Sequence, residues 1–296
     1  MKEKCKHTGK TNWPVTILLI MGCFTIFFPL YMAVIIAFKK PSEMTNDIMG
    51  ALSFPSSWSF DNFAEAMRVT DFWNSLGNSL LITALTVIIA ILVHSLAGYA
   101  IGRNMGNSKF YKFAYLYIVS GMFVPFAILM MPLVKQTSQM GIGNRAGVII
   151  LYVVFYMPMN LLLYSGYLKN IPLALEEAAR VDGAGLLTIC GKIYMPISKP
   201  VIATITLFYG IGYWNNYFNS LMFVDKSSLH TLQMILFRLQ SDVQMMKQLT
   251  TGIVRNPPAE GIKMATAVIT IGPIILLYPF LQKYFIKGII VGAVKG

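Results

Sequence analysis

Six uncharged, mostly apolar stretches divide the chain, and each is long enough to cross the hydrocarbon core of a membrane. A helical crossing takes about 20 residues. The stretches are 13–38, 79–102, 113–134, 146–168, 200–224 and 264–282. Because backbone polar groups in lipid must bond within their own segment, only helices suit these runs. The pattern predicts an all-α polytopic membrane protein with six transmembrane helices.

Composition supports a chain that lies in lipid. Of its 296 residues, 56% are hydrophobic and 12% are charged, and the mean hydropathy is +0.61, which is outside the range of soluble globular domains. The first stretch follows several lysines, as a signal peptide would, but it is longer than the apolar core of one, which is about 7 to 15 residues. We therefore interpret it as an uncleaved first helix.

Positive charge in the short connections predicts the orientation. Lysine and arginine fill the connections 103–112 and 169–199 and the C-terminal tail, whereas the loop 39–78 is richer in carboxylates. Since cytoplasmic loops carry the excess of lysine and arginine, both termini are expected to be cytoplasmic, although Lys135 and Arg145 run against this rule. The net charge of +12 then needs no nucleic-acid partner, because positive loops beside anionic lipid account for most of it.

These assignments give a domain organisation with one membrane domain. Residues 1–12 form a basic cytoplasmic N-terminus, 13–38 the first transmembrane helix and 39–78 an extracytoplasmic loop. The membrane core is expected at 79–287, with a cytoplasmic loop at 170–199, and 288–296 form a cytoplasmic tail. Within the outer loop, the apolar spacing from Phe60 to Met67 predicts a short amphipathic helix.

The cytoplasmic loop 170–199 carries most of the functional information. Its pattern predicts two short helices joined by a turn at Asp182 and Gly183, with Pro196 ending the second helix. A short, rigid and partly apolar element on the wet side of a membrane is suited to insertion into a groove of another protein.

The spacing in this loop resembles that of a known family. Glu177, Ala178 and Ala179 are followed by Gly183 after three residues, then by Ile193 after nine, and then by Met195-Pro196. This arrangement between the fourth and fifth of six spans resembles the EAA loop of bacterial ABC importer permeases. Met195 departs from the usual leucine, which is a volume-conserving exchange.

The resemblance covers nearly the whole chain and is nearest to sugar-importer permeases related to the smaller maltose-transporter membrane subunit. The C-terminal stretches 278–285, 287–288 and 292–296 look like those of the branch that imports oligosaccharides or complex glycans. The resemblance implies the type I ABC importer permease fold in the inner membrane of a bacterium. It also implies four kinds of partner beside the lipid bilayer: a second permease in a heterodimer, two ATPase subunits, an extracytoplasmic solute-binding protein and a carbohydrate substrate.

The resemblance also implies roles for particular residues. The EAA loop of the family docks on the ATPase, so Glu177 would face a basic residue of that partner and Gly183 would permit the turn. The tail of this type of subunit reaches toward the ATPase dimer, which would involve Gly292, Lys295 and Gly296. The implied mechanism is alternating access, in which ATP binding closes two ATPase subunits and the loop transmits their motion.

The energy source is expected on another chain. The sequence contains no GxxxxGK[ST] phosphate-binding loop, no HExxH and no GxSxG motif, and its three histidines are scattered. Cys5, Cys23 and Cys190 have neither a disulfide pattern nor metal-ligand spacing. We therefore expect no catalytic residue, metal or cofactor on this chain, with ATP and Mg held by the partner ATPase subunits.

Two groups of residues are candidates for the substrate path. In the fifth span they are Tyr209, Tyr213, Asn216 and Tyr217, which would share one helical face; in the fourth span they are Tyr152, Tyr156 and Asn160. Aromatic rings can cover the apolar face of a sugar while amides bond its hydroxyls. The alternative is that these side chains pack against a neighbouring helix or lie at the membrane interface. For the fifth span the two interpretations are about equally favoured.

Other features bear on competing functions. His94 is the one ionisable residue well inside a span, and we expect it to be neutral and bonded to a neighbouring helix in preference to acting as a proton relay. A secondary transporter driven by an ion gradient is the alternative function, but it should show buried carboxylates, and no span has an Asp or Glu well inside. A membrane-embedded transferase should show clustered aspartates for Mg²⁺, which are absent.

Overall fold

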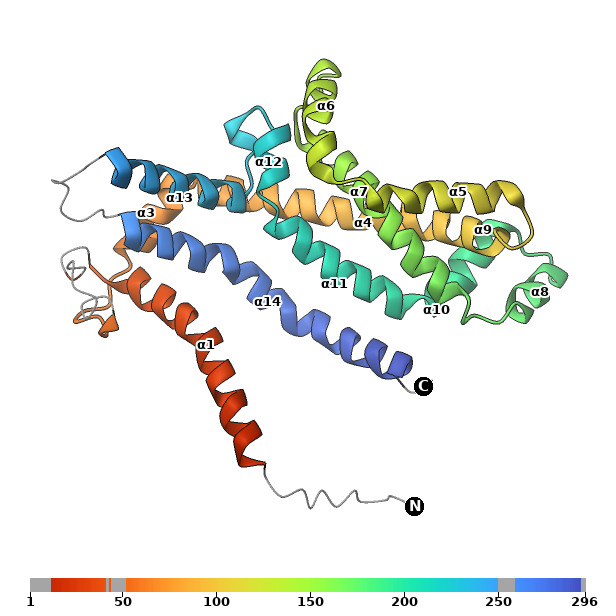
Figure 1. The fold of residues 1–296 in the computed structure, drawn as a ribbon, viewed down its shortest axis with the longest axis horizontal. Coiled ribbons are helices and arrows are strands. Elements are labelled where there is room, and N and C mark those ends of the chain that lie inside the picture. Colours follow the sequence, from red (N-terminus) through yellow and green to blue (C-terminus); the bar gives the residue numbers. More distant parts are fainter. Residues whose placement is uncertain (1–11, 41–42, 44–51, 250–258, 294–296) are drawn as a thin grey trace. The chain divides into compact units, whose positions relative to one another are not determined.

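The computed structural model describes residues 12–40, 43, 52–249 and 259–293, and every regular element in these segments is a helix (Figure 1). The elements are α1 (Trp13–Phe38), α3 (Asp61–Val69), α4 (Phe72–Asn104), α5 (Lys109–Ser120), η2 (Gly121–Phe123), α6 (Phe126–Gln139), α7 (Arg145–Leu168), α8 (Ala174–Val181), α9 (Leu186–Ile189), η3 (Cys190–Tyr194), α10 (Met195–Ile197), α11 (Lys199–Asn215), α12 (Phe218–Phe223), η4 (Ser227–Leu229), α13 (Leu232–Leu249) and α14 (Ala259–Ala293). The predicted all-α class is confirmed for this part of the chain.

The chain divides into two compact units. The first comprises Met1–Val69 and Gln240–Ile269, and the second comprises Thr70–Leu239 and Thr270–Gly296. In the first unit α1 and α3 pack together, with Ala37 and Ala66 fully buried in a small apolar cluster. The Asn62 side-chain amide donates to the carbonyl oxygens of Ala37 (3.0 Å) and Lys39 (2.7 Å), so α3 holds the C-terminal end of α1.

The second unit is built on the pairing of α4 with α7. Gly98 and Gly102 make this contact possible: a Cβ added at Gly98 would lie 2.5 Å from the Tyr164 Cβ, and one at Gly102 would lie 2.9 Å from Leu168. Glycines four residues apart lie on one helical face, and they let two membrane helices approach closely. The close pairing therefore fixes the C-terminal half of α4 against that of α7.

Three described helices are long and apolar enough to cross a membrane, namely α1, α4 and α7. The count rises to five if each of two bent pairs is one span. In the first pair, the helix ending at Phe123 meets α6 at 100°, so the stretch 113–134 consists of parts of two helices and is not one continuous helix. Pro125 explains the break, because a proline disfavours helical geometry in the residue before it and Val124 is extended there.

The remaining stretches match helices with revised bounds. The stretch 200–224 is interrupted after Asn215, because Asn216 is extended and a new helix, α12, begins at Phe218. The helix α4 begins at Phe72, so the last residues of the predicted loop 39–78 belong to it. The predicted amphipathic helix in that loop is confirmed as α3. The stretch 264–282 lies within the 35-residue α14, and the count of six spans stays a prediction.

Candidate functional site

The segment 170–199 contains the predicted pair of short helices. The first, α8, ends in a tight turn in which the Ala184 amide donates to the Ala179 carbonyl (2.9 Å) and the Gly183 amide donates to the Arg180 carbonyl (3.0 Å). These two bonds define a Schellman cap, which needs a left-handed residue after the helix. Gly183 supplies it with φ of +80°, so the turn predicted at Asp182 and Gly183 is confirmed.

The second half of the segment is anchored by apolar packing. Elements α9, η3 and α10 follow one another, and the helix then turns by 74° into α11 at Ser198, two residues after Pro196. Tyr194 is buried and its ring packs against that of Tyr99 of α4 in a tilted arrangement, with ring centroids 5.2 Å apart. Ile193 is half-buried against the same apolar cluster, which also contains residues of α7 and α11. The segment therefore rests on the ends of three long helices.

The opposite surface of the segment is open. Val181 is 88% exposed and Leu187 is 80% exposed, and Leu173, Leu175 and Leu186 are also exposed. Glu177, Ala178 and Asp182 are also exposed, whereas Ala179 is half-buried. A group of exposed apolar side chains of this kind is typical of a surface that another protein covers.

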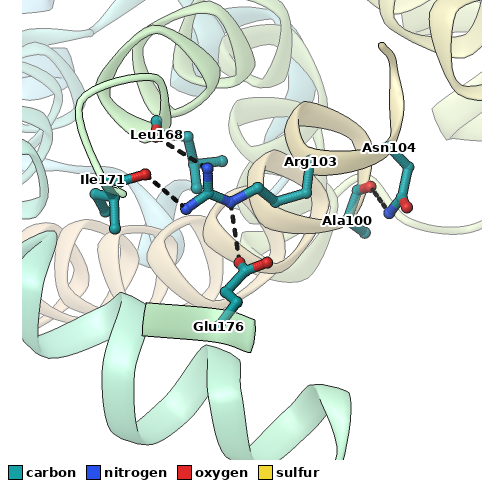
Figure 2. A network of polar contacts seen from close by, with 6 residues as sticks. All are labelled: Ala100, Arg103, Asn104, Leu168, Ile171 and Glu176. Atoms are coloured by element: carbon teal, nitrogen blue, oxygen red, sulfur yellow. Dashed lines mark hydrogen bonds and ion pairs between the residues drawn. The ribbon is translucent and has the colours of Figure 1, made fainter. Parts of the chain in front are cut away.

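A buried ion pair connects α8 to the end of α4 (Figure 2). Arg103 Nε donates to Glu176 Oε1 at 2.9 Å, and the side chains are only 14% and 8% exposed. The other two nitrogens of the guanidinium donate to the carbonyl oxygens of Leu168 (3.3 Å) and Ile171 (3.1 Å). Leu168 is the last residue of α7, so one side chain joins α4, the end of α7 and the start of the segment.

The sequence interpretation did not identify this pair. The sequence pattern assigns a role to Glu177 and none to Glu176, although Glu176 is the buried residue of the two and Glu177 is exposed. The available signal was weak: Arg103 directly follows the uncharged stretch 79–102, and an acidic residue could have been expected near it.

Four of the predicted path residues lie together. The rings of Tyr152, Tyr156, Tyr209 and Tyr213 make mutual contacts, with centroids 4.9 Å apart for Tyr152–Tyr213 and for Tyr156–Tyr209. Tyr152 and Tyr213 are buried, while Tyr156 and Tyr209 are half-buried. Among the described residues the Tyr213 hydroxyl has no hydrogen-bond partner. The tyrosine cluster, as these four residues are called below, therefore has an exposed side and a packed side between α7 and α11.

The side chains of the other three predicted path residues have partners outside this cluster. Asn216 accepts a hydrogen bond from the Asn219 amide at 2.9 Å, and the Tyr217 ring stacks on Phe237 at 4.3 Å. Because α11 ends at Asn215, these two do not continue the helical face of Tyr209 and Tyr213, as the sequence pattern had predicted. The helix periodicity fails here because the backbone becomes extended at Asn216.

Asn160 is engaged by His94, and both are fully buried. The Asn160 Nδ2 lies 2.7 Å from His94 Nδ1, and His94 Nε2 lies 2.8 Å from the Val153 carbonyl oxygen. With the amide in this orientation, its nitrogen donates to Nδ1 and the ring donates from Nε2 to the carbonyl, which is the neutral form of the imidazole. The expected bonding of His94 to a neighbouring helix is confirmed, and that helix is α7.

The remaining predictions concern the tail and metals. Gly292 lies within α14, which extends to Ala293, so part of the predicted tail 288–296 is helical. Lys295 and Gly296 lie outside the described residues. Within the described segments, no group of three or more His, Cys, Asp and Glu side chains could hold a metal ion, and Cys23 is exposed while Cys190 is buried.

Comparison with known proteins identifies the family. The model of the binding-protein-dependent transport system inner membrane component matches residues 94–291, which is more than half of the chain. The chain belongs to this family. The matched region contains α7, the segment 170–199 and the tyrosine cluster, so the predicted permease resemblance is confirmed.

Relatives of this family member align from end to end. The multiple sugar-binding transport system permease protein MsmG of Streptococcus mutans is 34% identical over 284 residues, which is 94% of this chain and 95% of that protein. The melibiose/raffinose/stachyose import permease protein MelC of Bacillus subtilis is 30% identical and covers 95% and 96%, respectively. These relatives are permease subunits, which are not catalytic alone. The same was expected of this chain.

A solved structure supports the fold. A chain from the crystal structure of a bacterial ABC transporter involved in the import of the acidic polysaccharide alginate has a TM-score of 0.79. The match covers 96% of the present chain and all of the chain in that crystal structure, at 24% sequence identity. The two chains therefore share one fold.

Proposed function

We propose that the protein is a permease subunit of a binding-protein-dependent ABC importer that carries a carbohydrate, with an oligosaccharide as the favoured substrate. The observation that carries this proposal is the alignment at 34% identity with a sugar permease over nearly the full length of both chains. The relative MelC is named for melibiose, raffinose and stachyose, which contain two or more sugar units, and this supports the oligosaccharide class. The family match weighs against the alternative of an ion-gradient-driven secondary transporter.

In the proposed complex the chain lies in the inner membrane of a bacterium, with both termini in the cytoplasm. Helices α1, α4 and α7, the two bent pairs and α14 would supply the six spans. A second permease subunit would complete the translocation path, a solute-binding protein would deliver the carbohydrate, and two ATPase subunits would bind ATP and Mg. The chain would then hold half of the path and no nucleotide.

The segment 170–199 is the proposed contact with the ATPase. Its exposed apolar residues, including Val181 and Leu187, offer the area that a stable contact needs, and Glu177 offers a charge to a basic partner residue. Burying exposed apolar side chains against a partner stabilises association by about 25 cal/mol per Å² before the costs of association. Motion of the ATPase can then bias the permease only if these contacts differ between its open and closed states.

The tyrosine cluster is the proposed contact with the carbohydrate. Tyr156 and Tyr209 present half-buried rings that can cover the apolar face of a sugar, and the unpartnered Tyr213 hydroxyl can bond to a sugar hydroxyl once the helices separate. Asn160 is bound to His94 and makes a weaker candidate than the sequence pattern indicated.

Carbohydrate-stimulated ATP hydrolysis by the reconstituted complex tests this function. The chain is purified from its native membrane with its partners, the complex is reconstituted in liposomes, and ATP hydrolysis is measured with di-, tri- and tetrasaccharides. We expect hydrolysis to rise only when both a carbohydrate and its binding protein are present. The Tyr209→Ala variant should raise the carbohydrate concentration at which hydrolysis is half-maximal. The matched Tyr209→Phe variant keeps the ring and should change it little. A chain that purifies alone and transports with an ion gradient would contradict the proposal.

A further inference from the structure

The two adjacent carboxylates of α8 have opposite surroundings. Glu177 is exposed on the surface proposed to meet the ATPase, whereas Glu176 is buried and paired with Arg103 of α4. A buried carboxylate is costly unless it is paired, and the 2.9 Å contact with the guanidinium satisfies that need. One turn of helix therefore has an outward charge for a partner and an inward charge for its own chain.

Each of the three guanidinium nitrogens of Arg103 donates a hydrogen bond to an oxygen of the protein. Nε bonds to Glu176, Nη1 to the last carbonyl of α7 at Leu168, and Nη2 to the carbonyl of Ile171 (Figure 2). The carbonyls at the end of a helix lack helical partners and carry partial negative charge, so a cation there is favourable. The guanidinium thus fixes three segments with one rigid, planar group.

The close contact between α4 and α7 connects the Arg103–Glu176 pair to the tyrosine cluster. Gly98 and Gly102 bring α4 into close contact with α7, and α7 carries Tyr152 and Tyr156 of the tyrosine cluster. The connection from Leu168 to Ala174 is short but not helical, so on its own it would allow α8 to turn relative to α7. The bond from Glu176 to Arg103 opposes that turning, because it attaches α8 to α4 as well.

We propose that Arg103 and Glu176 are a positioning pair that transmits displacement of α8 to α4 and α7, and through them to the tyrosine cluster. The proposal rests on the proposed function, in which the ATPase displaces α8. It assigns Glu177 to docking and Glu176 to transmission. Without the pair, α8 would still bind the ATPase, but part of its motion would be lost in the connection.

The test compares transport with hydrolysis in the assembled complex. The measured quantity is the amount of carbohydrate transported per ATP hydrolysed in liposomes. Both rates are normalised to the amount of assembled complex before the ratio is taken. The variants are Glu176→Gln, Arg103→Met and the double Arg103→Met/Glu176→Met. The double variant leaves no unpaired buried charge, and replacing both partners by apolar groups is often neutral for stability, so it should assemble. The control is Glu65→Gln/Arg68→Gln, which removes an exposed Glu–Arg pair on α3.

We expect the ratio to fall by about tenfold in the single and double variants, which is within the usual range for coupling between two sites. The double variant should be no worse than the singles, since both residues act through one contact. The ATPase should remain bound, and the control should keep the wild-type ratio. An unchanged ratio in the double variant would overturn the proposal, and so would loss of the ATPase from all three variants, which would assign the pair to docking or folding. If the wild type itself shows no carbohydrate-stimulated hydrolysis, the proposed function fails instead.

Discussion

At the scale of single residues, conformation and burial separate side chains that look equivalent. Glu176 and Glu177 are neighbours of the same type, but only Glu176 reaches an internal cation. Gly183 and Gly191 belong to the same segment, but only Gly183 has a positive φ. These differences decide which substitutions the segment 170–199 tolerates.

Gly183→Ala should lower the free energy of unfolding by about 1 kcal/mol, because a Cβ is strained in the left-handed region. Space is not the reason, since a Cβ added at Gly183 would have no neighbour within 4 Å. The control is Gly191→Ala, which also meets open space but is helical, and it should be neutral or slightly stabilising. Denaturant unfolding of the purified chain in detergent measures both. Equal effects of the two substitutions would contradict this explanation.

At the residue scale, the sequence predicts features that depend on nearby residues alone. The turn at Gly183 follows from an aspartate–glycine pair after a helical pattern, so it could be predicted. The burial of Glu176 depends on Arg103, which is 73 positions away in the chain, and no local pattern reveals that contact. The same holds for Asn160, whose partner is His94 of another helix.

At the scale of elements, close approach of α4 and α7 organises the second unit. Gly98 and Gly102 of α4 face α7, and the buried ion pair continues the same contact beyond the ends of the helices. Within lipid, apolar helices gain little from hydrophobic burial against each other, so tight packing and polar contacts must hold them.

Gly98→Ala should lower the free energy of unfolding by about 1 to 3 kcal/mol, the usual cost of overpacking a tight core. The added Cβ would lie 2.5 Å from the Tyr164 Cβ, so one of the helices must shift. Gly77→Ala in the same helix is the matched control, because a Cβ there has no neighbour within 4 Å. Thermal unfolding in detergent should separate the two variants, and a Gly98→Ala protein as stable as the control would show that α4 and α7 are not tightly packed.

Hydropathy predicts where helices lie better than where they bend. The bounds of α1 match the predicted 13–38, because charged or polar residues limit the apolar run at both ends. The bend of 100° before α6 lies inside an equally apolar run. A proline such as Pro125 is compatible with a kink there, but the angle depends on backbone geometry at Val124 that composition does not specify. Asn216 ends α11 for a similar backbone reason.

At the scale of the whole molecule, three features of one inner membrane component are connected. The exposed surface of the segment 170–199 is suited to a partner, the Arg103–Glu176 pair connects that segment to α4, and the tyrosine cluster lies between α7 and α11. The sequence predicts the segment, and it names the four tyrosines as candidates on two separate helices, since both follow from spacing; their clustering is a finding of the structure. It could not predict how they connect, because the connection is made by tertiary contacts.

If the protein is an ATPase-coupled permease, α8 contacts the ATPase, and cross-linking at α8 tests this contact. Val181→Cys places a thiol at a side chain that is 88% exposed, in a chain whose natural cysteines are replaced. The control is Trp73→Cys, at an exposed side chain near the start of α4. This position is about 45 Å along the helix from Arg103, the residue that pairs with α8. In native membranes treated with a short bifunctional thiol reagent, we predict that Val181→Cys is joined to an ATP-hydrolysing subunit and Trp73→Cys is not. If neither variant is joined to such a subunit, or if both are joined equally, the account of this protein as an ATPase-coupled permease is contradicted.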